Sequence, residues 1–334
     1  MNVIHLEQPS PKLSVVCVSY NHEPYLRQAL DSILMQEIAF PIEVLVGEDC
    51  SPDHSRDILR EYEEKHPGFF QMFYREENMG TTRNLYDLYT RARGQYIICL
   101  ETDDYWTDPC KLQKQVAFLD AYPEYIGCAH DCKVIDEYGH TIYPSLQNIP
   151  DQGRIVALQD FLQQGFIFQT ASFMFRNPFQ DGGDYSILYK AHPIVGDLTM
   201  LSILLLRGNI WLMPDCMSVY RRVIKKGGTS AASQSAANLA KSLEGSMRQL
   251  VILEEYFQGK IDYSHRKRYP AERYLSGWLR REAGFTAAGM RYIWNHAGSA
   301  VQRKLVCFAL GYPLRKVKKY WSRRKRKAKV TNGQ

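Results

Sequence analysis

Four acidic residues stand within ten positions in LETDDYWTDP, residues 100–109, directly after the apolar run QYIICL. Adjacent carboxylates repel each other, and removing them from water is costly. A divalent cation relieves both penalties, because Mg²⁺ and Mn²⁺ prefer hard oxygen ligands and bridge phosphate oxygens. Asp103 and Asp104 are therefore candidates for a site that binds a metal together with a phosphate-bearing ligand.

Alternating strands and helices lead up to this motif. Strands are predicted where apolar and β-branched residues run together, at 13–20, 42–49, 69–74 and 95–100. A segment with helical spacing follows each of the first three. This order predicts an α/β fold with a mainly parallel sheet and helices on both of its faces.

Polar residues end three of these strands, and ligands of such sheets bind at the carboxyl ends of strands. The first strand ends on Ser19 and Tyr20, the second on Asp49, and the fourth on Asp103 and Asp104. The sequence contains neither GxGxxG nor GxxxxGK[ST], so a glycine-rich loop does not neutralise a bound diphosphate. A carboxylate-bound cation would do so instead.

Several segments resemble the nucleotide-binding half of a family 2 glycosyltransferase with the GT-A fold. These are SVVCVSYNHEPYLRQALDSIL, EVLVGEDCSPDHS and GQYIICLETDDYWTDPCKLQKQVAFLD. The resemblance continues through GDLTMLSILLLRGNIWLMPDCMSVYRR and spans residues 12–230. It implies an inverting enzyme that uses a nucleotide sugar and Mn²⁺ or Mg²⁺.

The resemblance also implies which residues hold the nucleoside. Ser19 and Tyr20 fall where family members contact the uracil or thymine ring, and Asp49 falls where a carboxylate accepts from N3 of the base. Arg83, in NMGTTRN, lies in a region that supplies a base or phosphate contact. Asp103 matches the ribose-binding position.

Two further positions are implied to take part in the reaction. Asp104 matches the ligand of the metal that bridges the two phosphates. Asp197, in HPIVGDLTM, matches the general base that takes the proton of the acceptor hydroxyl. The segment SVYRR resembles the part that closes over the donor, although Arg222 stands near where many relatives have a histidine.

Each candidate also has a purely structural interpretation. Asp49 or Asp53 would suit the cap of the next helix, and Asp197 would suit the N-cap of LTMLSILLL. Trp106 would either brace its loop or contact a sugar. The cluster CAHDC, residues 128–132, is interpreted as part of a strand rather than as a metal site.

The rest of the chain suggests a three-part organisation. A catalytic domain is predicted at 12–230, a helical region at 231–314 and a basic tail at 315–334. The tail holds ten Lys and Arg and no acidic residue, so residues 1–314 carry a net charge of −4. No run is long and apolar enough for a membrane helix. Cysteines within apolar stretches suit a reducing compartment, so a cytoplasmic protein is expected, with the tail able to attach it to an anionic membrane face.

The leading hypothesis is a transferase that moves a sugar from a UDP- or dTDP-sugar to a hydroxyl of a saccharide or lipid-linked acceptor. Synthesis of a surface polysaccharide is the expected setting. Two alternatives remain open at this point. One is a protein that binds an anionic surface or nucleic acid through its basic tail, and the other is a sugar-nucleotide binder without catalytic activity.

Overall fold

The computed structural model describes residues 10–165, 167–223 and 237–309. The chain forms two compact units, residues 1–233 and 234–334, and each is described by itself. The predicted domain limits at residues 230 and 314 remain predictions. The predicted tail, 315–334, lies outside the described residues.

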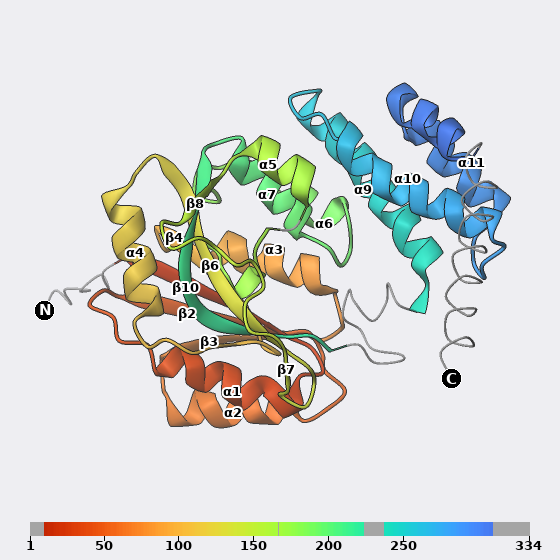
Figure 1. Cartoon of the computed structure of the whole chain (residues 1–334). Helices are drawn as coiled ribbons and strands as arrows, with labels where there is room; N and C mark the ends of the chain where they lie inside the picture. Colours follow the sequence, from red (N-terminus) through yellow and green to blue (C-terminus); the bar gives the residue numbers. More distant parts are fainter. Residues whose placement is uncertain (1–9, 166, 224–236, 310–334) are drawn as a thin grey trace, which may run out of the picture. The chain divides into compact units, whose positions relative to one another are not determined.

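A ten-stranded sheet forms the centre of the first unit (Figure 1). Its strand order is β3-β2-β1-β4-β9-β6-β10-β5, with β7 beside β6 and β8 beside β10. The strands are β1 (Leu13–Ser19), β2 (Ile42–Glu48), β3 (Phe70–Tyr74), β4 (Tyr96–Glu101), β5 (Tyr105–Trp106), β6 (Tyr125–Ile135), β7 (Thr141–Tyr143), β8 (Arg154–Val156), β9 (Met174–Arg176) and β10 (Asn209–Arg221).

The longest strand pairings are parallel, which confirms the predicted fold class. β1 pairs in parallel with β2 and β4, β2 with β3, and β6 with β10. The short strand β9 is antiparallel to both β4 and β6 and joins the two parallel groups. As a result β4 and β6 run in the same direction, and the carboxyl ends of all the long strands lie at one edge.

Helices cover both faces of the sheet (Figure 1). On one face α1 (Glu23–Leu34), α2 (Ser55–Lys65) and α4 (Lys111–Ala121) pack with alternate strand residues into one apolar core. On the other face α3 (Thr81–Arg91) packs against β1 and β2. The remaining helical elements are α5 (Leu158–Gln164), the 3₁₀ turn η1 (Thr170–Ser172), α6 (Ile187–Lys190) and α7 (Asp197–Leu205).

Gly47 lets α3 approach β2 closely. The Asn84 side chain Nδ2 donates to the Gly47 carbonyl at 3.0 Å. A Cβ at position 47 would lie 2.4 Å from Asn84 Oδ1, which is too close for any side chain. The start of α3 is thereby held beside the carboxyl end of β2.

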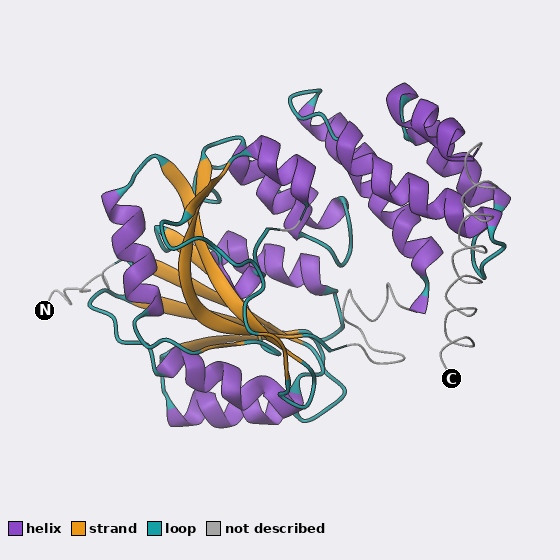
Figure 2. Ribbon diagram, in the orientation of Figure 1, coloured by secondary structure: helices purple, strands orange, loops and turns teal. Residues whose placement is uncertain are grey.

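In the described residues of the second unit, helices joined by loops are the only regular secondary structure (Figure 2). It contains α9 (Leu239–Phe257), α10 (Ser264–Leu279), α11 (Ala287–His296) and a helical stretch at 299–309. Its own apolar core includes Leu243, Met247 and Ile293, so the predicted helical region is confirmed. Across the described parts of both units, no helix combines the length and the hydropathy needed to cross a membrane.

Candidate active site

The strand register brings the predicted residues to one edge of the sheet. Ser19 pairs with Glu48, and Val18 pairs with Glu101. The residues that follow these strand ends therefore surround one rim. The Ser19 hydroxyl is buried there and has no hydrogen-bond partner among the described groups. Tyr20, next in the chain, is half-buried.

Asp49 organises the loop that leads into α3. Its Oδ1 accepts from Met79 N at 2.8 Å and its Oδ2 from Gly80 N at 3.0 Å. Burial raises the pKa of Asp49, and the two backbone hydrogen bonds oppose that rise. Asp49 does not cap the helix that follows it. The N-cap position is His54, and Asp53, just before it, accepts from Ser55 N at 3.0 Å at the start of the helix.

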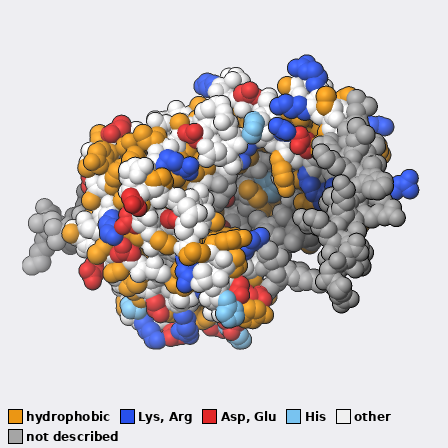
Figure 3. Space-filling view, viewed as in Figure 1, with side chains coloured by type: hydrophobic (Ala, Val, Ile, Leu, Met, Phe, Trp, Pro, Cys, Tyr) orange, Lys and Arg blue, Asp and Glu red, His pale blue; other side chains and the backbone are white. Residues whose placement is uncertain are grey.

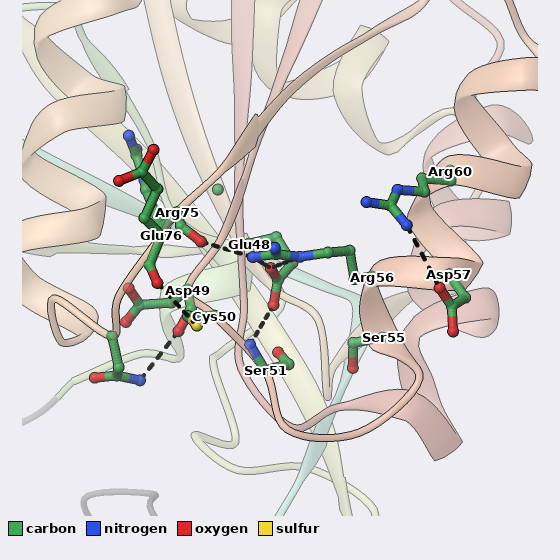
Figure 4. Close-up of polar contacts among 12 residues, drawn as sticks. Glu48, Asp49, Cys50, Ser51, Ser55, Arg56, Asp57, Arg60, Arg75 and Glu76 are labelled. Atoms are coloured by element: carbon green, nitrogen blue, oxygen red, sulfur yellow. Dashed lines mark hydrogen bonds and ion pairs between the residues drawn. The ribbon is translucent and has the colours of Figure 1, made fainter.

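Glu48, the residue before Asp49, is bonded to Ser51 and Arg56, as the close-up in Figure 4 shows. The buried Glu48 carboxylate accepts from Ser51 N at 2.6 Å and from Arg56 Nε at 2.7 Å. These bonds close a tight turn in which Cys50 takes a left-handed backbone with φ of 59°. The backbone on both sides of Asp49 is thus held by Glu48, which is buried and paired with the partly exposed Arg56.

Arg83 lies on the first turn of α3, exposed, with its guanidinium 5.9 Å from the centre of the Tyr189 ring. The same turn touches the segment before α7. A Cβ at Gly196 would lie 3.4 Å from Thr82 Cγ2. Because Asp197 follows Gly196, the proposed nucleoside side of the rim and the proposed base lie next to each other.

Carboxylates crowd the end of β4. Asp104 is buried, and its pKa is raised well above the usual value by that burial and then by the negative charges of Asp103 and Glu101. The pKa of Glu101 is raised too, first by burial and then by Asp103 and Asp197. The structure therefore gathers four carboxylates within electrostatic reach of one another.

Asp197 is the first residue of α7, and its N-cap is Gly196. The N-cap alternative for Asp197 does not hold, although its carboxylate lies at the positive end of the helix dipole. Burial raises the pKa of Asp197 to about 6, and a hydrogen bond from Thr170 opposes the rise. His192 braces the preceding loop, since its Nδ1 accepts from Ile194 N at 3.1 Å and Val195 N at 3.0 Å.

The closing segment SVYRR reaches the rim through the end of β10. The Arg221 backbone N donates to Asp104 Oδ1 at 2.7 Å, and its guanidinium donates to the Asp103 carbonyl at 3.1 Å and to Gln28 Oε1 at 2.8 Å. Arg222 is exposed. Lys225 and Lys226, which follow shortly after in the sequence, lie outside the described residues.

A divalent cation suits the chemistry of this cluster. Both oxygens of Asp104 accept one hydrogen bond each, and a carboxylate offers about four lone-pair sites in all. In the described residues no three His, Cys, Asp or Glu side chains gather as a complete metal site. Mg²⁺ does not require one, because it is commonly bound through one or two carboxylates plus substrate phosphates and water.

Sequence reasoning did not find three residues of the site. Glu101 is one of the acidic residues of LETDDYWTDP, but only the adjacent pair Asp103 and Asp104 is predicted to bind a ligand; in the structure Glu101 is the last residue of β4. Gln169 and Thr170 contact Asp104 and Asp197, yet they lie in FIFQTASFMFR, which carries no motif. For Trp106 the sequence allows two roles, bracing its loop or contacting a sugar. It is buried, and its Nε1 donates to the Ala171 carbonyl at 2.9 Å, so it braces its surroundings.

Comparisons with known proteins agree with this geometry. The model of the family "Glycosyl transferase family 2" matches residues 14–183. An uncharacterized protein of Mycobacterium tuberculosis is 33% identical over 283 residues, 82% of this chain and 75% of that protein. A Bacillus subtilis protein provisionally named teichuronic acid biosynthesis glycosyltransferase TuaG is 33% identical over 136 residues, 39% of this chain and 53% of that protein.

A solved structure shows the same fold. Residues 1–349 of Staphylococcus aureus TarS, crystallised in complex with UDP, match with a TM-score of 0.59 and 17% identity. The match covers 87% of this chain and 82% of that one. The same part of TarS has also been crystallised with UDP-GlcNAc. The predicted GT-A fold is thereby confirmed, and the family model that matches residues 14–183 confirms the predicted family resemblance.

Replacing Asp49 by Ala should release the loop before α3. Hydrogen exchange at the Met79 and Gly80 amides is expected to speed up at least tenfold, because each amide loses its carboxylate acceptor. Asp53→Ala is the matched control and should instead speed exchange at Glu23 and Ser55. Unchanged exchange at Met79 and Gly80 in the Asp49 variant would contradict the assignment.

Proposed function

Because this chain belongs to glycosyl transferase family 2 and is a glycosyltransferase, we propose that it transfers a sugar, with inversion, from a UDP- or dTDP-sugar to an acceptor hydroxyl. Ser19, Tyr20, Asp49, Arg83 and Asp103 bind the nucleotide. Asp104 is the metal ligand and Asp197 the general base. The single observation that carries the proposal is the crowding of carboxylates at the edge where β1, β2 and β4 end.

The nucleoside role is supported by groups that the protein leaves available. The buried Ser19 hydroxyl has no partner within the described structure, and Tyr20 beside it presents an aromatic face on which a pyrimidine can stack. The Asp49 carboxylate is fixed by two amides and retains lone pairs for the N3–H of uracil or thymine. TarS, which has the same fold, binds UDP and UDP-GlcNAc.

The proposed binding of a cation by Asp104 is supported by the negative charge gathered at the end of β4. The negative charge of Asp103 contributes to the raised pKa of both Asp104 and Glu101, so a bound Mn²⁺ or Mg²⁺ would be held by Asp104 and would relieve the repulsion among these carboxylates. Such an ion would stabilise the negative charge that develops on the departing nucleoside diphosphate. Hard carboxylate oxygens are the ligand type that these two metals prefer.

Asp197 completes the reaction. Its carboxylate takes the proton of the acceptor hydroxyl while the hydroxyl oxygen forms a bond to the anomeric carbon. The bond from that carbon to the diphosphate oxygen breaks, and its electron pair leaves with the nucleoside diphosphate. Attack from the face opposite the leaving group inverts the anomeric centre. A pKa near 6 suits a base that works near neutral pH.

Asp104→Asn is expected to remove the metal dependence of nucleotide binding. Isothermal titration of UDP should show binding to the wild-type chain that Mn²⁺ strengthens at least tenfold, and binding to the variant that Mn²⁺ does not change. Asp108→Asn, four residues further on and paired with Lys114 at 2.7 Å, is the matched control. An Mn²⁺ effect that survives in the Asp104 variant would refute the metal assignment.

Donor turnover is expected to rise with pH through the pKa of Asp197. An acid whose folded pKa is raised to about 6 is mostly protonated at pH 5, where it cannot accept a proton. The rate should therefore increase about tenfold between pH 5 and pH 7 and then level off. Asp197→Asn should lower turnover at every pH and leave UDP affinity unchanged. Turnover close to the wild-type rate in that variant would exclude Asp197 as the base.

The setting that we propose is the cytoplasmic face of a membrane, with a saccharide or lipid-linked acceptor in surface polysaccharide synthesis, as the name of TuaG suggests. The uneven distribution of charge along the chain supports a location at an anionic membrane face. Residues 234–334 hold 22 Lys and Arg and 6 Asp and Glu, so this unit carries +16 and residues 1–233 carry −10. Lys and Arg side chains are prominent on the visible face of the helical unit (Figure 3).

Removal of residues 315–334 should weaken attachment to anionic membranes. Each Lys or Arg near such a surface contributes about 1 kcal/mol, so we expect at least a tenfold loss of binding to phosphatidylserine-containing vesicles. Vesicles of phosphatidylcholine alone should bind both forms weakly. UDP binding with Mn²⁺ should not change. Equal vesicle binding by the full and shortened chains would exclude the tail as the attachment.

A further inference from the structure

One dipeptide reaches two of the rim carboxylates. Gln169 Nε2 donates to Asp104 Oδ2 at 2.5 Å, and the neighbouring Thr170 side chain lies close enough to Asp197 to lower the pKa of that carboxyl by hydrogen bonding. Asp104 follows the end of β4, whereas Asp197 begins α7. Adjacent side chains of one short segment therefore contact groups from two separate elements.

The direction of the Gln169 amide is fixed by its other bond. Gln169 caps η1, and its Oε1 accepts from Ala171 N at 3.0 Å. The side chain is also buried. With the oxygen used by a backbone N–H, only the NH₂ group can face Asp104. The hydrogen-bond network thus defines the donor and the acceptor without ambiguity.

Buried side chains hold η1 in place. Trp106 Nε1 donates to the Ala171 carbonyl and Gln115 Nε2 to the Ser172 carbonyl, both at 2.9 Å. Trp106 is itself packed under the buried Lys111, whose Nζ lies 4.2 Å from the ring centre. The turn cannot shift without breaking these buried bonds, which cost more to lose than exposed ones.

Both donors are uncharged, and this matters for a carboxylate that must receive a cation. A Lys or Arg at position 169 would neutralise Asp104 and compete with the metal. An amide instead occupies one lone pair and leaves the negative charge and the other lone pairs available. The Thr170 hydroxyl likewise orients Asp197 and leaves it able to accept a proton.

We propose that Gln169 and Thr170 are positioning residues, which set Asp104 and Asp197 at a fixed separation so that the cation-held diphosphate and the base act on the same anomeric carbon. This inference rests on the proposed function. It extends that function because one dipeptide would hold both Asp104, which binds the cation, and Asp197, which accepts the proton.

Gln169→Met tests the first half, because Met keeps the length of the side chain and removes the donor. UDP titrations with and without Mn²⁺ should show that the variant binds UDP at least tenfold more weakly than wild type in Mn²⁺ and about equally without it. Gln163→Met, at an exposed position of α5, is the matched control. An unchanged affinity, or equal weakening under both conditions, would overturn the role of Gln169.

Thr170→Val and Thr170→Ser test the second half without substrate, and they decide the matter if Gln169→Met does not fold. The ¹³C NMR titration of the Asp197 carboxyl, assigned with Asp197→Asn, should move to higher pH in the Val variant and stay at the wild-type midpoint in the Ser variant. Glu101, Tyr89 and Cys99 share its surroundings in all three proteins. Identical midpoints in both variants would overturn the role of Thr170.

Failure of the underlying function would look different. A wild-type chain whose binding of UDP and of dTDP ignores Mn²⁺ would refute the metal-dependent transferase, and the positioning role would fall with it. Normal Mn²⁺-dependent binding by wild type together with unaffected variants would refute only the positioning role.

Discussion

Mutual repulsion among crowded carboxylates, of which Asp104 is buried and the others are partly buried, is the constraint on which the active edge depends. Glu101 is the last residue of β4, and Asp103 and Asp104 follow it closely. Asp197 lies within electrostatic reach of Glu101. An unpaired buried charge costs several kcal/mol, so an enzyme that needs these groups must hold them by other means. The described part of the rim does so mainly with neutral partners, which are backbone amides, an amide side chain and a hydroxyl. In addition, His22 Nε2 lies 3.9 Å from Asp103 Oδ2, and the Arg221 guanidinium donates to the Asp103 carbonyl.

The fold supplies these neutral partners from distant parts of the chain. The antiparallel strand β9 brings η1 beside β4, and β10 brings the Arg221 amide to Asp104. On the other side of the rim, Gly47 allows α3 to lie close to β2, so that the loop amides before α3 reach Asp49. Asp49 is thus oriented by two backbone amides, and Asp104 by one backbone amide and the Gln169 side chain.

The strand-end candidates could be predicted from the sequence because they follow directly from local pattern. Ser19, Asp49, Asp103 and Asp104 were predicted because each follows or ends an apolar run. The parallel arrangement of these strands then predicts that the four residues lie at one edge of the sheet. Gln169 and Thr170 could not be predicted in this way. Their role depends on the antiparallel insertion of β9 between β4 and β6. That tertiary arrangement cannot be predicted from a strand of only three residues. Trp106 shows the same limit, since its role depends on η1.

The most direct test of the central claim is the position of the cation itself. Crystals of the full chain grown with UDP and Mn²⁺ can be measured at the manganese absorption edge, where anomalous scattering locates the ion. The account predicts one strong peak at about 2.1 Å from a carboxylate oxygen of Asp104 and in contact with both phosphates. Bound UDP with no manganese peak, and Asp104 bonded only to Gln169 and Arg221, would contradict it.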